Sequence, residues 1–154
     1  MLINFVVFII DMEKQHTGYY EGILQLRDPT DEVLDYFDSW ISKQKNVSIT
    51  KAVKLKTGYD FYLTSNKSLL AIGKKLYVRF GGEQKISSKL HTVRRQTSKE
   101  LYRVTVMFRP PKFKRGDIVE VRGQKLRIKQ MKRKVLGIDV ESGKKVWFDY
   151  GDAR

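Results

Sequence analysis

Lysine and arginine side chains are concentrated in the last third of the sequence, and the chemistry they offer is phosphate binding. Residues 109–134 contain 11 basic residues and only 2 acidic ones. In an extended segment, Lys125, Arg127 and Lys129 would share one face, while the two apolar residues between them take the other. This pattern predicts a surface that binds the phosphates of RNA. Its predicted residues are Lys112, Lys114, Arg115, Arg122, Lys125, Arg127, Lys129, Lys132, Arg133 and Lys134.

A second basic cluster surrounds the hairpin that is predicted just before this region. It contains Lys85, Lys89, Arg94, Arg95 and Lys99. Affinity that depends on such contacts falls as salt rises. The slope of the logarithm of the binding constant against the logarithm of the salt concentration is about −0.9 per phosphate for duplex DNA and about −0.7 for single strands. The sequence has neither the aromatic signature of an RRM domain nor a GxxG clamp. We therefore expect recognition of the backbone and shape of folded RNA rather than of base sequence.

Four aromatic residues near these cations have rings on which bases could stack: Phe113, Trp147, Phe148 and Tyr150. A domain as small as this one also needs a large side chain in its core. We therefore expect either Trp147 or Phe148 to be buried, and the pattern leaves open which of the two it is.

Residues for catalysis, metal binding or cofactor binding stand in no recognisable arrangement. The two histidines, His16 and His91, lie in no acid–base or metal motif, and there is no cysteine. Lack of cysteine excludes disulfides, thiol nucleophiles and cysteine-based zinc sites. No nucleotide-binding or hydrolase motif is present, and Gly81-Gly82 is interpreted as a helix end. The acidic residues between 28 and 38 are interpreted as a solvated helix face. We expect no catalytic residue, no metal, no cofactor and no enzymatic activity.

The overall charge favours a polyanionic partner. The 154 residues include 31 basic and 17 acidic side chains, a net charge of +14. The first 50 residues carry 4 basic and 8 acidic side chains, and the rest carry 27 and 9. Such a field attracts nucleic acid, with anionic membrane as the alternative. The apolar run at residues 2–10 is too short to span a bilayer. We expect it to be a buried strand, or to precede the true start at Met12, and we expect a cytoplasmic protein.

The elements that position the cations are predicted to form an α+β domain. The expected order is strand, helix, strand, strand, helix, strand, strand, with both helices on one face of a mostly antiparallel sheet. Asp28-Pro29 is expected to begin the first helix and Ser65-Asn66 the second. The last two strands are expected over residues 83–90 and 101–109, with a polar loop between them.

Pro110-Pro111 is the predicted boundary to a second domain. Beyond it, short strand-forming segments are separated by glycine turns, a pattern typical of a small SH3-like β-barrel. The predicted division is residues 1–18 as an apolar N-terminal segment and tail, 19–109 as the α+β domain and 110–154 as the barrel.

Four stretches are familiar when they are taken in order. They are YYEGILQLR (Tyr19–Arg27), GYDFYLTS (Gly58–Ser65), RFGGEQKISSKL (Arg79–Leu90) and LYRVTVMFRPPKFKRGDIVEV (Leu101–Val121). Together they resemble the archaeal form of the 60S ribosomal export adaptor family, the nonsense-mediated-decay protein three family. The resemblance implies a non-enzymatic factor that binds the large ribosomal subunit and its ribosomal RNA during late maturation. It also implies that the C-terminal part, through GDIVEV (Gly116–Val121), is similar to the SH3-like half of initiation factor five A.

The sequence departs from this family in two places. Members usually begin with paired CxxC zinc motifs, whereas this sequence has no cysteine. It also ends at Arg154 without a second barrel or an acidic or leucine-rich export segment. Zinc binding and nuclear export are therefore not expected. We expect a cytoplasmic factor that binds the large subunit in ribosome assembly or quality control. The alternatives are a general nucleic-acid-binding or translation factor and a peripheral membrane protein.

Overall fold

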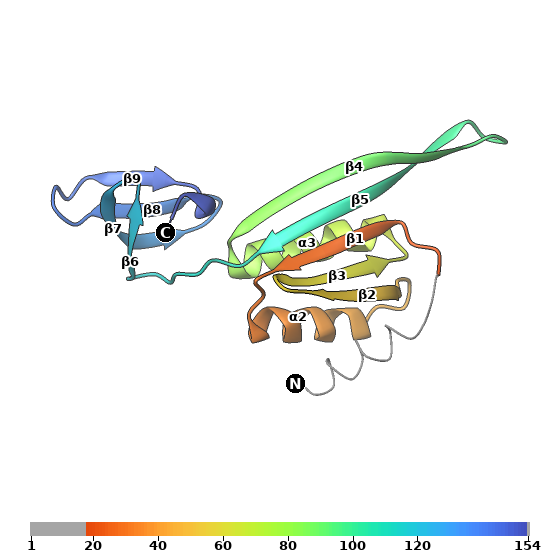
Figure 1. The fold of residues 1–154 in the computed structure, drawn as a ribbon, viewed down its shortest axis with the longest axis horizontal. Helices are drawn as coiled ribbons and strands as arrows, with labels where there is room; N and C mark the ends of the chain where they lie inside the picture. The colour runs from red at the N-terminus through yellow and green to blue at the C-terminus, as the bar shows by residue number, and fades with distance from the viewer. Residues whose placement is uncertain (1–17, 154) are drawn as a thin grey trace.

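Two β-sheets with separate hydrophobic cores make up the part of the chain that the structure describes, residues 18–153 of a computed structural model (Figure 1). The expectations for residues 2–10 and for His16 lie outside these residues. The first sheet and its helices are built from β1 (Gly22–Arg27), α2 (Asp31–Ser42), β2 (Ile49–Leu55), β3 (Gly58–Leu63), α3 (Asn66–Phe80), β4 (Glu83–Arg94) and β5 (Lys99–Arg109).

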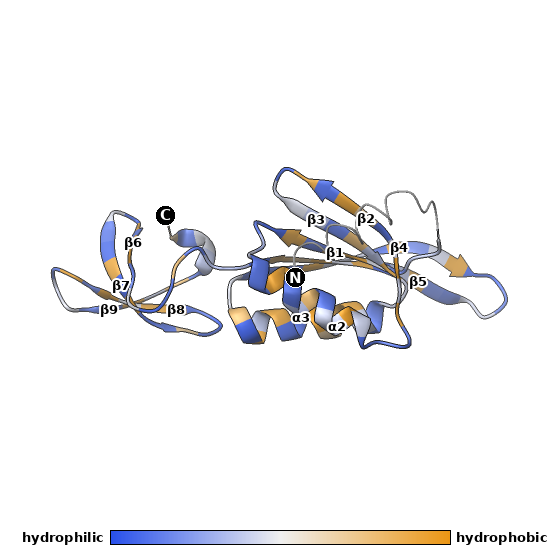
Figure 2. Cartoon of the chain, turned by 90° about the horizontal axis from the view of Figure 1, so that it is seen from below, coloured by the Kyte–Doolittle hydropathy of each residue, from blue (hydrophilic) through white to orange (hydrophobic). Residues whose placement is uncertain are grey.

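The first sheet has the strand order β2-β3-β1-β5-β4. Its strands pair antiparallel except β1 and β5, which run parallel. Figure 2 shows both helices on the same face of this sheet. The mixed α+β class is confirmed, with a sheet that is mostly antiparallel.

Burial alternates along the central strand β1, whose Leu24 and Leu26 are completely buried. They pack with Phe61 of β3, Phe37 of α2 and other buried side chains in one apolar cluster. Apolar residues at period two on the strand and at helical spacing on the helices therefore meet in a single layer. This core fixes the positions of α3 and β5, from which the basic segments extend.

The predicted start of α2 at Asp28-Pro29 is wrong by two residues. Thr30 is the N-cap, and its hydroxyl accepts a hydrogen bond from the Val33 amide at 3.4 Å. Asp28 instead has a positive φ of 44° and donates its amide to the Thr57 carbonyl at 2.6 Å. Asp28 therefore ends β1 in a turn, and the helix begins only after it.

The start and end of α3 agree with the sequence-based interpretation. The Ser65 hydroxyl accepts a hydrogen bond from the Ser68 amide at 3.3 Å, which caps the first turn. At the other end, Gly81 is the C-cap with φ of 68°, a conformation that glycine adopts at low cost.

The polar loop expected between residues 90 and 101 is wrong, because most of it continues the β4–β5 hairpin. The two strands stay paired as far as Arg94 and Lys99, with a register shift between Leu90 and Thr92. All residues from 91 to 100 are exposed. This part of the ribbon covers no core, so it lacks the alternation of apolar and polar residues by which a strand is predicted.

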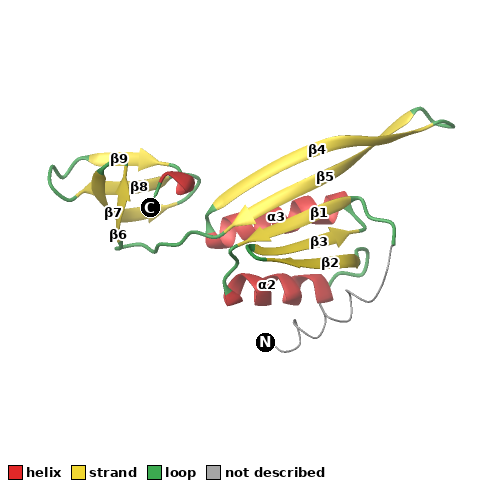
Figure 3. Ribbon diagram, viewed as in Figure 1, coloured by secondary structure: helices red, strands yellow, loops and turns green. Residues whose placement is uncertain are grey.

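The second sheet is formed by β6 (Ile118–Val121), β7 (Gln124–Met131), β8 (Val135–Asp139) and β9 (Lys145–Phe148), followed by a 3₁₀ helix at Tyr150–Asp152 (Figure 3). Its order is β6-β7-β8-β9, and no strand ladder joins β6 to β9 within residues 18–153. The sheet is therefore open, and the predicted SH3-like barrel is not confirmed. A single bridge from Val121 to Ala153 covers the outer edge of β6. The division of the chain into independent domains at Pro110-Pro111 stays a prediction.

Candidate nucleic-acid interface

The basic stripe on β7 stands on a buried apolar base. Leu126 and Ile128 are 0% and 1% exposed and pack into the core of the second sheet. Lys125, Arg127 and Lys129 are exposed on the opposite face. Burial of the two apolar residues therefore fixes the direction of Lys125 and Arg127, as strand alternation requires. Lys129 stands at a register shift between Ile128 and Gln130.

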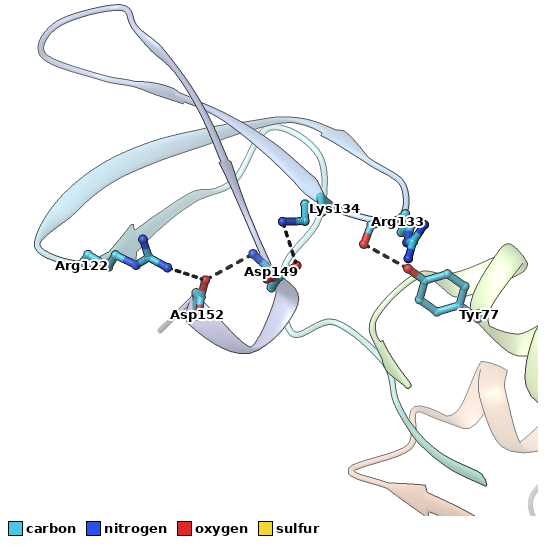
Figure 4. Close-up of polar contacts among 6 residues, drawn as sticks. All are labelled: Tyr77, Arg122, Arg133, Lys134, Asp149 and Asp152. Carbon is cyan, nitrogen blue, oxygen red and sulfur yellow. Dashed lines mark hydrogen bonds and ion pairs between the residues drawn. The ribbon is translucent and has the colours of Figure 1, made fainter. Parts of the chain in front are cut away.

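All 15 side chains of the two predicted basic clusters are exposed. Three of them make ion pairs with carboxylates among the described residues: Lys85 with Glu83 at 3.0 Å, Arg122 with Asp152 at 3.3 Å and Lys134 with Asp149 at 3.9 Å. Figure 4 shows the last two pairs. Exposed pairs of this kind contribute about 0–1 kcal/mol, so a phosphate group can replace the carboxylate at low cost.

The end of the β4–β5 hairpin extends past the rest of the first sheet as a two-stranded arm, residues 89–103 (Figure 1). The pairing of β1 with β5 begins only at Gly22 and Val104, so within residues 18–153 the arm has no third strand. Along the arm, Lys89 lies directly opposite Arg103, and Arg94 opposite Lys99. Like charges in directly opposite positions destabilise a strand pair. An isolated hairpin is itself marginally stable.

The two basic clusters lie at opposite ends of the molecule rather than on one continuous surface. Figure 1 shows the tip of the arm and the second sheet on either side of the first sheet. β4 has 12 residues, so at about 3.4 Å per residue it carries the tip almost 40 Å from its base. The two predicted clusters therefore do not form one continuous surface. Only Lys85, at the base of β4, belongs to the end of the hairpin near the second sheet.

The basic turn Lys132-Arg133-Lys134 is held in place through its backbone. The Tyr77 hydroxyl, from α3, donates to the Arg133 carbonyl at 3.0 Å (Figure 4). The Tyr150 hydroxyl donates to the Lys132 carbonyl at 2.7 Å. Burial raises the pKa of Tyr150, while the backbone N–H of Gly82 acts in the opposite direction. Since both tyrosines bond to carbonyls, the three cationic side chains remain exposed.

Of the four aromatic residues, only Trp147 is classed as exposed. Phe148 is 3% exposed and is the large core residue of the second sheet, whereas Trp147 is 57% exposed. Phe113 is 9% exposed and stacks on Tyr150, with ring centroids 6.1 Å apart. The open choice between Trp147 and Phe148 is therefore resolved, and Phe113 and Phe148 are not accessible to a base.

Sequence reasoning missed two sets of cations. Arg103 lies on the arm, and its guanidinium carbon is 4.1 Å from the ring centroid of Tyr20. Lys67, Lys74 and Lys75 are exposed on α3. The helical spacing of these three lysines could have been read from the sequence.

Three further observations bear on the other function classes. Within residues 18–153, no group of three His, Cys, Asp or Glu side chains could hold a metal ion. No helix in this part of the chain is long and apolar enough to cross a membrane. A groove of about 410 Å³ lies between the sheets and is lined by residues that include Glu83, Arg109 and Phe113.

Comparison with known proteins identifies the family. No curated protein matches the chain. The model of one family, described as NMD3, second domain, matches residues 19–109, which is more than half of the sequence and includes the whole first sheet with its helices and arm. The chain therefore belongs to the NMD3 family, whose members are non-enzymatic adaptors of the large ribosomal subunit.

Proposed function

We propose that this protein binds ribosomal RNA of the large ribosomal subunit, as a cytoplasmic factor in ribosome assembly or subunit quality control. Family membership supports the ribosomal partner. The contact with RNA is supported by the charge distribution on the two ends of the molecule. One end is the arm, and the other is the second sheet with its basic turn.

The arm is the observation that carries this proposal. It places Lys89 against Arg103 and Arg94 against Lys99 on a ribbon that no third strand joins in the described part of the chain. Such pairs lower stability in the free protein. They are relieved when a polyanion binds, because each phosphate neutralises charge on the ribbon and releases counterions from the nucleic acid. A surface of this kind is suited to phosphates and unsuited to a neutral or basic partner.

The absence of a base-reading motif, together with backbone contacts, predicts binding that depends on RNA shape. The arm and the second sheet are far enough apart to contact two separate RNA segments at once. Linking two weak contacts in one molecule raises the overall affinity without any new contact.

Filter binding with large-subunit and small-subunit ribosomal RNA, titrated between about 50 and 200 mM salt, tests the proposal. We expect affinity that falls steeply with salt and a preference for large-subunit RNA. Replacing Arg127, Lys129 and Arg133 by Glu should weaken binding to every RNA and reduce the salt slope by up to about 2.7.

A matched control reverses three exposed cations elsewhere, Lys45, Lys54 and Lys56, with the same change in net charge. If the control variant loses as much affinity, binding depends on net charge alone and not on these three positions. Equal affinity for both ribosomal RNAs and for unrelated RNA would favour a general nucleic-acid-binding or translation factor. Binding to anionic vesicles but not to RNA would favour a peripheral membrane protein.

A further inference from the structure

We propose that Trp147 is a stacking platform for one unpaired nucleobase, so that the second sheet contacts a single-stranded nucleotide as well as phosphates. This inference rests on the RNA binding proposed above and adds a specific subsite to it. The ligand is a nucleobase in a loop, bulge or end of RNA.

The register of the second sheet places Trp147 on the face opposite its core. Val135 and Phe148 are paired and both belong to the core, so the next pair, Leu136 and Trp147, lies on the other face. Leu136 is 8% exposed although it is not part of the core cluster, whereas Trp147 is 57% exposed. A buried leucine thus lies opposite a large ring that remains open to solvent.

Two cations lie near Trp147 on this face. Lys145 precedes it by two residues on the same strand, about 7 Å away. In the next row, Lys145 pairs with Ile138 and Ile138 with Arg127, which puts Arg127 about 12 Å from Trp147 across two strands. Arg127 and Ile138 also line a shallow groove of about 660 Å³, together with Arg115 and Lys129.

Three carboxylates lie near this face, and each has a partner. Asp139 lines the groove beside Arg127 and accepts hydrogen bonds from the Glu141 amide at 3.0 Å and the Ser142 hydroxyl at 2.8 Å. Glu120 is paired with Lys125 on the distant edge strand. Asp149, two residues after Trp147, is 3.9 Å from the ammonium group of Lys134. Along the chain, Trp147 therefore stands between Lys145 and an Asp149 that is already paired with Lys134, and Leu136 lies opposite it.

This combination identifies a nucleotide as the occupant. An exposed tryptophan offers a flat apolar ring, and base–aromatic stacking contributes about 1–3 kcal/mol per base. The surrounding lysine and arginine side chains are placed to bind the phosphates on either side of that base. An acidic protein surface could also cover an exposed tryptophan and its cations, and the RNA binding proposed above favours the nucleotide.

Tryptophan fluorescence tests the inference directly, because the sequence has two tryptophans. Trp40 is partly buried against the core of the first sheet, so Trp40→Phe leaves Trp147 as the reporter. Two probes are compared at the same ionic strength: an adenine-rich single-stranded oligoribonucleotide and an inorganic polyphosphate of matched charge. Circular dichroism checks the fold of each variant.

We expect the oligoribonucleotide to quench Trp147 fluorescence and polyphosphate to bind without quenching. In the otherwise unchanged protein, Trp147→Ala should lower the affinity for the oligoribonucleotide by about 5- to 150-fold. The same variant should change polyphosphate affinity by less than about twofold. Trp147→Phe keeps an aromatic ring and should lose less affinity than Trp147→Ala.

Oligoribonucleotide binding with neither quenching nor an effect of Trp147→Ala would overturn the inference while leaving the proposed RNA binding intact. Trp147 would then be a candidate contact for a ribosomal protein. Equal quenching by polyphosphate would also overturn it, because that signal needs no base. Failure of both probes to bind would overturn the inference and the proposed function together.

Discussion

The like-charged pairs of the arm make a prediction in which stability and affinity change in opposite directions. In Arg94→Glu, the residue opposite Lys99 becomes acidic, so a repulsive cross-strand pair becomes an attractive one. Cross-strand pairs of opposite charge contribute about 0.2–1 kcal/mol. The arm of the variant should therefore be better ordered than the arm of the natural protein.

The affinity of Arg94→Glu for RNA should nevertheless fall. A lost phosphate contact reduces the salt slope by about 0.9 on duplex nucleic acid, which corresponds to about fivefold in affinity at 0.15 M salt. The double variant Arg94→Glu/Lys99→Glu again has like charges opposite each other, so the stability gain should vanish. Its affinity should fall by about 30-fold.

Two assays separate these effects. Amide hydrogen exchange of the arm measures its local stability, and filter binding across a salt series measures the phosphate contacts. Lys54→Glu, an exposed position on the opposite edge strand β2, is the control with the same charge change. The reasoning is refuted if Arg94→Glu keeps the salt slope of the natural protein, or if Lys54→Glu lowers affinity and slope equally.

Three further predictions concern how the second sheet is held. Gly81→Ala should destabilise the protein by about 1–2 kcal/mol in chemical denaturation, because φ is +68° and the added Cβ would lie 2.6 Å from the Tyr150 hydroxyl oxygen. Phe148→Ala should lower the free energy of unfolding by about 3–5 kcal/mol, and NMR spectra should show a disordered second sheet. Trp147→Ala should lower it by about 0.5 kcal/mol or less. The pKa of Tyr150 is raised by burial from its ordinary value of 10.0, so the folded state holds this proton more tightly than the unfolded chain. Its stabilising contribution is present below about pH 10 and is lost as pH rises through the raised pKa, and Tyr150→Phe should make thermal stability less sensitive to pH in that range.

The sequence predicts best those elements that cover a core. Alternation in β7 correctly separates Leu126 and Ile128 from the cations beside them, and the Ser65 cap and Gly81 end of α3 are both found. These features depend on local geometry and on burial, which leave a clear pattern in the residues.

Features that depend on distant contacts were not predictable in the same way. The strands of the arm have no core beneath them, so their residues show no burial pattern. Closure of the second sheet depends on whether β6 meets β9, and no local signal reports that contact. The choice between Phe148 and Trp147 is decided by the register between β8 and β9. The separation of the two basic clusters likewise follows from the length of the hairpin.

Sedimentation with ribosomal particles tests the central claim most directly. The natural protein should migrate with the large ribosomal subunit in a sucrose gradient and leave it as salt rises. A variant with Glu at Arg94, Arg127, Lys129 and Arg133 should remain at the top of the gradient, while the Lys45, Lys54 and Lys56 control still migrates with the subunit. Migration of the first variant with the subunit, or salt-independent migration of the natural protein, would contradict the account.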